Sequence, residues 1–476
     1  MKNDSNNSDV LFLRSALDNT EIESVLEWIQ TLNNTVEVKV TRIPFDSLSL
    51  WKYDNILGAL KHSSGKFFSI EGIHVKTNWG NTPEWEQPII NQPEIGFLGI
   101  ITKEINGVLY FLMQAKIEPG NVNNIQLSPT LQATRSNYTQ VHKGKQPLYL
   151  DFFKNASHSQ IILDQLQSEQ GARFLKKRNR NIIIKIDSDI PVYNNFIWLS
   201  LGQIKKLIQY DNIVNMDTRT VISGITYGSD ENSIYKVLCE IDTNERLKVI
   251  NEVFLRSCVK ENNTYYSIDE IISFLTNIKS KYDLEINKVP LNKLKGWVYN
   301  NNEVVHVNNK YFKVIAVDVE IDNREVVKWG QPMIEPAQEG LCAFICKEIN
   351  GILHFIVQAK LECGNHDIIE LAPTVQCLTG NYRQTKDGSL PFLDYILNVK
   401  KEQIVFDTIQ SEEGGRFYRE QNRNMIVIAG IEIDENLPQN YIWMTLNQLF
   451  TFLKFNNFLN IQARSLISAI SFMNHE

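Results

Sequence analysis

The chain has 476 residues, and its hydrophobic fraction of 43% and charged fraction of 22% are typical of a folded globular protein. This length is too great for one ordinary hydrophobic core and favours two domains of roughly 200 residues each. The formal net charge of −7 argues against general nucleic-acid binding, which depends on a cationic surface.

The first predicted elements occur twice along the chain. Residues 20–23 and 267–270 have the form of a capping box and precede apolar residues at helical spacing, so each predicts the start of a helix. β-rich runs follow at 66–70 and 310–314.

The clearest local signal is a hairpin. Residues 97–105 and 108–116 are apolar and β-rich, and Asn106-Gly107 joins them; Asn350-Gly351 has the same place later in the chain. An Asn-Gly pair between such runs predicts a type I′ turn between antiparallel strands.

Further elements complete each half. We expect a short strand at 130–134, a helix at 159–178, a strand at 181–187, and helices near 201–209 and 218–225. The polar residues 228–233 are the best linker candidate, which gives two modules at 1–228 and 234–476. Each module is predicted to be α+β, a mixed or antiparallel sheet with flanking helices.

Polar strings recur at a constant offset of 244 residues. Trp85, Gln114, Lys116, Glu118 and Gln132 return as Trp329, Gln358, Lys360, Glu362 and Gln376. A period this long indicates a duplicated domain and not a solenoid, whose repeats run about 20–50 residues. Because a core requires an apolar pattern and no particular polar residues, the repeat predicts two related ligand sites, or one active site and one relic.

Several familiar motifs are absent from the sequence. It contains no dinucleotide or nucleotide glycine loop, no His-Glu-x-x-His, no Cys-x-x-Cys and no Gly-x-Ser-x-Gly. All six cysteines lie in the second half without the spacing of a zinc site, so we expect buried reduced thiols, and we expect His354 to be packed. The polar N-terminus and the lack of a long apolar stretch predict a cytoplasmic protein without a membrane partner.

The longest polar strings carry a family resemblance. Residues 114–121, 126–139, 166–171 and 215–220, and in the second half 323–326, 370–376, 411–417 and 463–466, closely resemble the NDP-hexose 2,3-dehydratases. The resemblance covers nearly the whole chain. It implies a tandem pair of Nudix-like modules and a homodimer. Neither copy has the metal-binding Nudix helix, which removes the carboxylate cluster that would hold Mg²⁺ against a pyrophosphate.

The resemblance also implies a reaction. The substrate would be TDP-4-keto-6-deoxyglucose, whose 4-ketone acidifies the C3 hydrogen, and the 2-hydroxyl would leave as water. This chemistry needs no cofactor and no metal, and the product would pass to a 3-ketoreductase or a 3-aminotransferase. The alternatives are a silent nucleotide-sugar binding protein and another NDP-sugar enzyme, such as an epimerase or a hydrolase.

Such a site needs a base, a proton donor and anchors for the diphosphate. The candidates for proton transfer and catalysis are Tyr138, Glu118, Glu169 and Lys116. The candidates for substrate binding are Trp85, Gln114, Gln132, Thr134, Arg135, Ser136, Asn137, Arg180, Asp217, Arg219, Trp329, Lys360, Asn381, Tyr382, Arg416 and Arg423.

Structural roles are open for some of these residues. Asn137 suits a turn, Lys116 a solvated strand end and Glu169 a helix end, while Trp85 and Trp329 suit packing anchors.

The N-terminal copy is the favoured catalytic copy. It has Arg135 and Asp217 where the other copy has Thr379 and Gln462. The segment 412–416, however, is more charged than its N-terminal counterpart, which favours the second copy.

Overall fold

The computed structural model describes residues 2–134, 146–228, 234, 237–238, 251–259, 263–322, 327–378 and 390–473. Its α-helices are α1 (Lys2–Ala16), α2 (Glu23–Asn34), α4 (Leu150–Lys154), α5 (Leu201–Ile208), α6 (Met216–Ser223), α9 (Glu252–Ser257), α10 (Ile268–Lys281), α12 (Leu393–Leu397), α13 (Leu446–Leu453) and α14 (Ile461–Ala469). Short 3-10 helices are η1 (Phe45–Ser47), η2 (His158–Gln160), η3 (Leu291–Lys293) and η4 (Lys401–Gln403).

The strands fall into two series, one in each half of the chain. The first series is β1 (Val38–Ile43), β2 (Trp51–Asp54), β3 (Ala59–His62), β4 (Ser69–Thr77), β5 (Glu84–Asn91), β6 (Gly96–Ile105), β7 (Val108–Ile117), β8 (Ile125–Ser128), β9 (Leu131–Ala133), β10 (Ile161–Ser168), β11 (Arg178–Ile186) and β12 (Phe196–Ser200). The second is β13 (Leu284–Val289), β14 (Trp297–Tyr299), β15 (Glu303–His306), β16 (Phe312–Ile321), β17 (Lys328–Pro336), β18 (Gly340–Ile349), β19 (Ile352–Leu361), β20 (Ile369–Ala372), β21 (Val375–Leu378), β22 (Ile404–Ser411), β23 (Gln421–Ile428) and β24 (Tyr441–Thr445).

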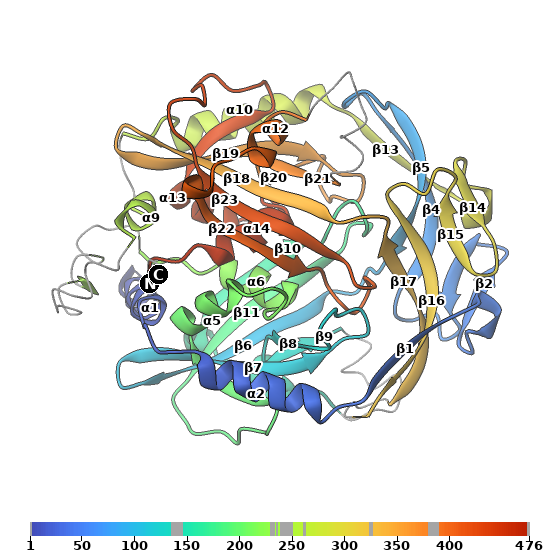
Figure 1. Cartoon of the computed structure of the whole chain (residues 1–476), viewed down its shortest axis with the longest axis horizontal. Helices are drawn as coiled ribbons and strands as arrows, with labels where there is room; N and C mark the ends of the chain where they lie inside the picture. The colour runs from blue at the N-terminus through green and yellow to red at the C-terminus, as the bar shows by residue number, and fades with distance from the viewer. Residues whose placement is uncertain are drawn as a thin grey trace.

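These strands form four sheets in two matching pairs. Each half has a seven-stranded mixed sheet, ordered β10-β11-β6-β7-β12 in the first half and β22-β23-β18-β19-β24 in the second, with two further short strands in each. The pairings β11–β6 and β18–β23 are parallel. Two five-stranded antiparallel sheets lie at the other end of the molecule (Figure 1). The predicted α+β class with mixed sheets is confirmed.

The two halves exchange a strand. β1 from the first half pairs with β16 of the second, from Val38 opposite Ile321 to Ile43 opposite Ala316. Reciprocally, β13 from the second half pairs with β4 of the first. Each five-stranded sheet therefore contains one strand of the other half, and the two halves interlock.

The two Asn-Gly turns are as predicted. Asn106 and Gly107 have φ of 53° and 82°, and Asn350 and Gly351 have φ of 54° and 76°. Two successive positive φ values define the type I′ turn that matches the twist of an antiparallel pair.

The predicted helix at 159–178 is wrong. After η2 the chain forms β10, which pairs with β11 antiparallel. The polar residues of β10 contact the other half: the Gln167 amide donates to the carbonyl of Leu453 at 2.9 Å, and the Ser168 hydroxyl donates to Glu370 at 2.8 Å. Pairing and cross-half contacts therefore override the local helical pattern.

The two capping boxes have different outcomes. Ser267 accepts from the backbone of Glu270 and caps α10 as predicted. The Thr20 prediction is wrong, because α2 follows Ile22 without a side-chain cap and the Thr20 hydroxyl donates to Asp18.

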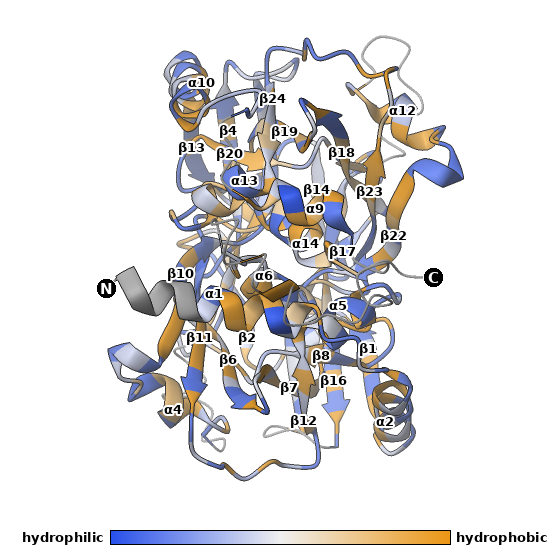
Figure 2. Cartoon of the chain, turned by 90° about the vertical axis from the view of Figure 1, so that its left-hand side faces the viewer, coloured by the Kyte–Doolittle hydropathy of each residue, from blue (hydrophilic) through white to orange (hydrophobic). Residues whose placement is uncertain are grey.

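A shared core joins the halves. The largest apolar cluster includes Leu127 and Val221 from the first half and Leu371 and Leu466 from the second. The helices α6 and α14 pack against each other at its centre, between the two halves (Figure 2).

The expectations for thiols and His354 are met in the described part of the chain. Cys258, Cys342, Cys346 and Cys363 are buried and free, and Cys377 is partly buried, while Cys239 lies outside the described residues. His354 is fully buried, and its Nε2 accepts from the backbone of Tyr265. Among the described helices, none is long and apolar enough to cross a membrane.

Candidate functional site

Each half of the chain places one loop against the end of a strand of the other half. The amide of Gly120, just after β7, donates to the carbonyl of Gly414 at 2.8 Å, and the amide of Arg419 donates back to Gly120 at 2.8 Å. In the equivalent place, Gly364 donates to Gly171 at 2.6 Å and Lys176 donates to Gly364 at 2.7 Å. The loop after β22 therefore sits at the end of β7, and the loop after β10 sits at the end of β19.

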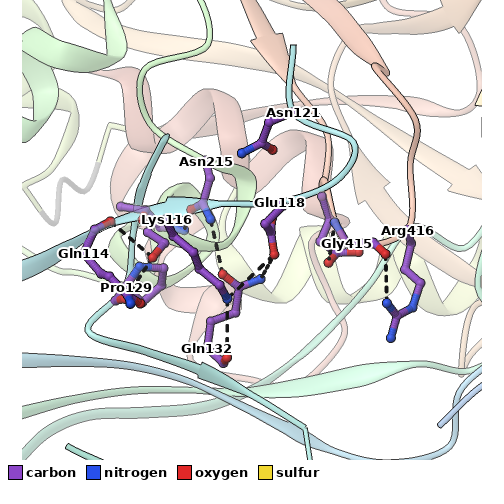
Figure 3. A network of polar contacts seen from close by, with 12 residues as sticks. Gln114, Lys116, Glu118, Asn121, Pro129, Gln132, Asn215, Gly415 and Arg416 are labelled. Atoms are coloured by element: carbon purple, nitrogen blue, oxygen red, sulfur yellow. Dashed lines mark hydrogen bonds and ion pairs between the residues drawn. The ribbon is translucent and has the colours of Figure 1, made fainter. Parts of the chain in front are cut away.

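At the first of these junctions a polar group surrounds Gln132 of β9. The Gln132 amide donates to Glu118 Oε1 at 2.8 Å, and Asn215 donates to Gln132 Oε1 at 3.4 Å. Lys116 Nζ lies 3.7 Å from Glu118 Oε1 and 3.5 Å from the Gln132 carbonyl (Figure 3). Glu118 therefore contacts both an ammonium group and an amide donor.

The loop from the second half completes this group. Glu413 Oε1 accepts from the amide of Gly415 at 3.1 Å, and Arg416 donates to the Gly415 carbonyl at 2.9 Å. Arg416 also donates to Gln92 at 3.2 Å and stacks over Phe68 with its Cζ 4.1 Å from the ring centre. The residues Lys116, Glu118, Gln132, Asn215, Asp217, Glu413 and Arg416 are called the first cluster below.

Asp217 is the deepest carboxyl of the first cluster. Asn215 caps α6 by accepting from the amide of Thr218 at 2.8 Å, which places Asp217 in the first turn. The Asp217 residue is 3% exposed, and its Oδ1 has no hydrogen-bond partner among the described residues. Burial, and then the nearby carboxylate of Glu413, raise the pKa of Asp217 well above its ordinary value.

The surroundings of Glu413 also change the pKa of its carboxyl. Burial, and then repulsion from Glu118, raise the pKa of Glu413 to about 7. The carboxyl therefore exists in both protonation states near neutral pH, as proton transfer requires. Lys116, Gln132, Glu413 and Arg416 keep partial solvent exposure, so the cluster is not sealed.

The second junction has the same framework with fewer charges. Lys360 donates to the Gln376 carbonyl at 2.8 Å, Gln376 donates to Glu362 at 3.0 Å, and Asn460 donates to Gln376 at 2.7 Å. The positions of Asp217, Glu413 and Arg416 are filled by Gln462, Gln170 and Arg173. This second cluster thus has one carboxylate where the first has three, and both have two cations.

Some predicted site residues lie elsewhere. Arg180 pairs with Asp164 and Arg423 pairs with Asp407, both at partly exposed positions on the sheets. Arg219 is 1% exposed and bonds to Ser465 and to the backbone of Ser411 across the interface of the halves. The structure does not bring these three arginines into the first cluster.

The two tryptophans support the exchanged loops. Trp85 donates to Gln87, whose amide donates to the carbonyl of Ala172 at 3.0 Å. Trp329 donates to Gln331, which holds the carbonyl of Gly415 at 2.7 Å. Their observed contacts therefore fit the anchoring role that the sequence left open.

The remaining candidates divide into described and undescribed residues. Glu169 lies next to the first cluster and accepts from Asn179 at 2.6 Å, while Gln114 and Thr134 are partly buried on or beside β7 and β9. The predicted residues outside the described part of the chain are Arg135, Ser136, Asn137, Tyr138, Asn381 and Tyr382.

Sequence reasoning missed Glu413 as a residue of this cluster. A signal existed, because Glu413 aligns with Gln170 in the other copy and is thus a charged residue in only one of them. The described residues contain no group of three or more His, Cys, Asp or Glu side chains placed to hold a metal ion.

Comparison with known proteins gives one consistent result. A family model for NDP-hexose 2,3-dehydratase matches residues 22–225 and again 268–470. A dTDP-4-dehydro-6-deoxy-alpha-D-glucopyranose 2,3-dehydratase of Saccharopolyspora spinosa is 45% identical over 448 residues, 93% of this chain and 90% of the relative. Proteins of the same name from Streptomyces violaceoruber and Amycolatopsis orientalis are each 39% identical, over 93% and 94% of this chain and 95% and 90% of their own lengths.

Proposed function

Because the chain belongs to the NDP-hexose 2,3-dehydratase family, we propose that it removes water across C2 and C3 of dTDP-4-dehydro-6-deoxyglucose, the substrate named for its relatives. The reaction is a carbon–oxygen lyase step that opens 2-deoxysugar biosynthesis. The single observation that carries the proposal is the match of two family regions, which together span most of the chain.

The chemistry requires four proton movements: two that accompany the loss of water and two that convert the resulting enol into the diketone. A base takes the C3 hydrogen, and the electrons move into an enolate with the C4 oxygen. The enolate collapses to form the C2–C3 double bond, and the C2 hydroxyl leaves with an added proton as water. The resulting enol takes a proton at C2 and loses its hydroxyl proton, which gives the 3,4-diketo-2,6-dideoxy sugar.

We assign this reaction to the first cluster. Glu118, which contacts Lys116 and Gln132, is the carboxyl that we assign as the base, and Arg416 offers a planar fork for the diphosphate. The second cluster has the same cation count but lacks two of the three carboxyls, which suits binding of an anionic nucleotide without proton transfer. Tyr138 and Arg135 remain proposed participants.

Further properties are proposed from the family resemblance and from the sequence. Each half is a Nudix-like module, the protein works as a cytoplasmic homodimer, and its product passes to a 3-ketoreductase or a 3-aminotransferase. Turnover needs no NAD, PLP or divalent metal, so a chelator is expected to leave the rate unchanged.

The test is incubation with TDP-4-keto-6-deoxyglucose and mass detection of products. A dehydratase gives a product lighter by one water, a binding protein leaves the sugar intact, and a hydrolase releases TMP. A matched pair of variants locates the site: Glu118→Gln is expected to abolish turnover, while Glu362→Gln leaves it near wild type. The reverse pattern would place the active site in the second cluster.

A further inference from the structure

The two charge differences between the clusters come from opposite halves of the chain. Asp217 belongs to the first half, where the other copy has Gln462, and Glu413 belongs to the second half, where the other copy has Gln170. Taken from the sequence alone, Asp217 favours the first copy as the catalytic one, whereas Glu413 favours the second copy. The exchanged loops place both carboxyls in the first cluster, because Gly414 is bonded to Gly120 across the interface.

The carboxyl of Glu413 points toward the same place as the carboxyl of Glu118. A Cβ built on Gly415 would lie 2.3 Å from Glu413 Oε1 and 3.6 Å from Glu118 Oε1, so both carboxyls converge on the face of Gly415. In the second cluster the Gly415 position is Ala172, and the residue at the Glu413 position is the amide Gln170. Gln170 donates to the carboxylate of Glu412 and is thereby engaged in the interface.

We propose that the carboxyl of Glu413, supplied by the second half of the chain, is the proton donor to the departing C2 hydroxyl in the first cluster. The inference rests on the proposed placement of the reaction in that cluster. Glu118 takes the C3 proton, and Glu413 gives its proton to the C2 oxygen as the C2–O bond breaks. The enol then returns its hydroxyl proton to Glu413 while Glu118 delivers its proton to C2, so both carboxyls regain their starting states.

The charged side chains that face Glu413 support its role as a proton donor. Lys116 of β7 and Glu118 just after it face Glu413, as do Glu169 just after β10 and Arg416 of the same loop. Glu413 in turn acts on Asp217 of α6. Burial, and then the neighbouring carboxylates, favour the protonated form of Glu413, so this carboxyl can hold a proton near neutral pH.

The test separates the two proton transfers. TDP-4-keto-6-deoxyglucose is incubated in D₂O, and C3 exchange by NMR is measured beside loss of water. We expect Glu413→Gln to lower water loss about 100-fold or more while C3 exchange and TDP affinity by calorimetry stay near wild type. Normal water loss in this variant would overturn the proposal, and so would loss of C3 exchange together with water loss while TDP still binds.

Two further measurements keep the result interpretable. Glu118→Gln is expected to lose both exchange and water loss; if it keeps both, the placement of the reaction in the first cluster fails independently of Glu413. If Glu413→Gln does not fold, the wild-type pH profile decides. A donor of pKa about 7 predicts that water loss falls as pH rises above 7 while C3 exchange does not. Water loss that is level between pH 6 and 9 would refute it.

Discussion

The amide of Gly120 and the carbonyl of Gly414 form a 2.8 Å hydrogen bond between the two halves of the chain. The approach leaves no room for a side chain, because a Cβ on Gly120 would lie 1.7 Å from the carbonyl oxygen of Phe417. At the equivalent place, a Cβ on Gly364 would lie 1.8 Å from the carbonyl oxygen of Phe174. Both obstacles are backbone atoms, which cannot move aside as a flexible side chain does.

Gly120→Ala and Gly364→Ala form a matched pair. Each is expected to lower the free energy of unfolding by about 1–3 kcal/mol through steric overlap, measured from urea unfolding midpoints. Only Gly120→Ala displaces the loop of the first cluster, so turnover per folded molecule should fall in that variant alone. An equal loss of turnover in folded Gly364→Ala would contradict the assignment of the reaction to the first cluster.

Gly415→Ala tests the position of the Glu413 carboxyl without removing it. The added methyl meets the end of a flexible side chain, so the fold should persist while Glu413 is pushed away from Glu118. We expect kcat to fall at least about tenfold, with little change in TDP binding. Ala172→Gly is the control at the equivalent position and should leave kcat near wild type. Unchanged kcat in Gly415→Ala would mean that this carboxyl position is not needed.

Arg219 is predicted to stabilise the fold and not to bind substrate. Replacing it by Met leaves the Ser411 carbonyl and the Ser465 hydroxyl without their buried donor, and the expected loss is about 3 kcal/mol, by analogy with broken buried ion pairs. Arg180→Met removes a partly exposed pair with Asp164 and should cost about 0–1 kcal/mol. Chemical denaturation of both variants checks this; equal costs would argue against it.

Stability should fall with rising pH on account of Glu412. Burial, and then repulsion from Glu420, raise the pKa of Glu412 to about 8. Between its ordinary value of 4.5 and about 8, the folded protein holds a proton that the unfolded chain has lost, so unfolding becomes easier as pH rises through this window. Glu420→Gln removes the like charge and should flatten the dependence, as measured by urea midpoints at pH 6 and pH 9. A midpoint in the wild type that rises with pH would exclude this account.

The sequence predicted local features whose cause is local. The Asn106-Gly107 turn and the Ser267 cap depend on a few adjacent residues, and both are present. The prediction of a helix at β10 is wrong, because the strand depends on pairing with β11 and on side-chain contacts with the other half, such as that of Gln167 with Leu453, which the local pattern does not reveal. The same limit applied to the site: Lys116, Glu118 and Gln132 were found as neighbours in one string, whereas Glu413 joins them only through the exchanged loop.

The exchange of β1 and β13 has a consequence for how the two clusters diverged. If the two modules were separate, identical chains encoded by one gene, every mutation would appear in both of their sites. One site could then not lose a side chain while the other kept it. Joining the two copies in one gene removes this constraint. The second cluster has amides at two positions where the first has carboxyls, and these positions lie in different halves of the chain, at Gln170 in one and Gln462 in the other. Because each half completes a five-stranded sheet of the other, we expect that neither half expressed alone forms its complete sheet.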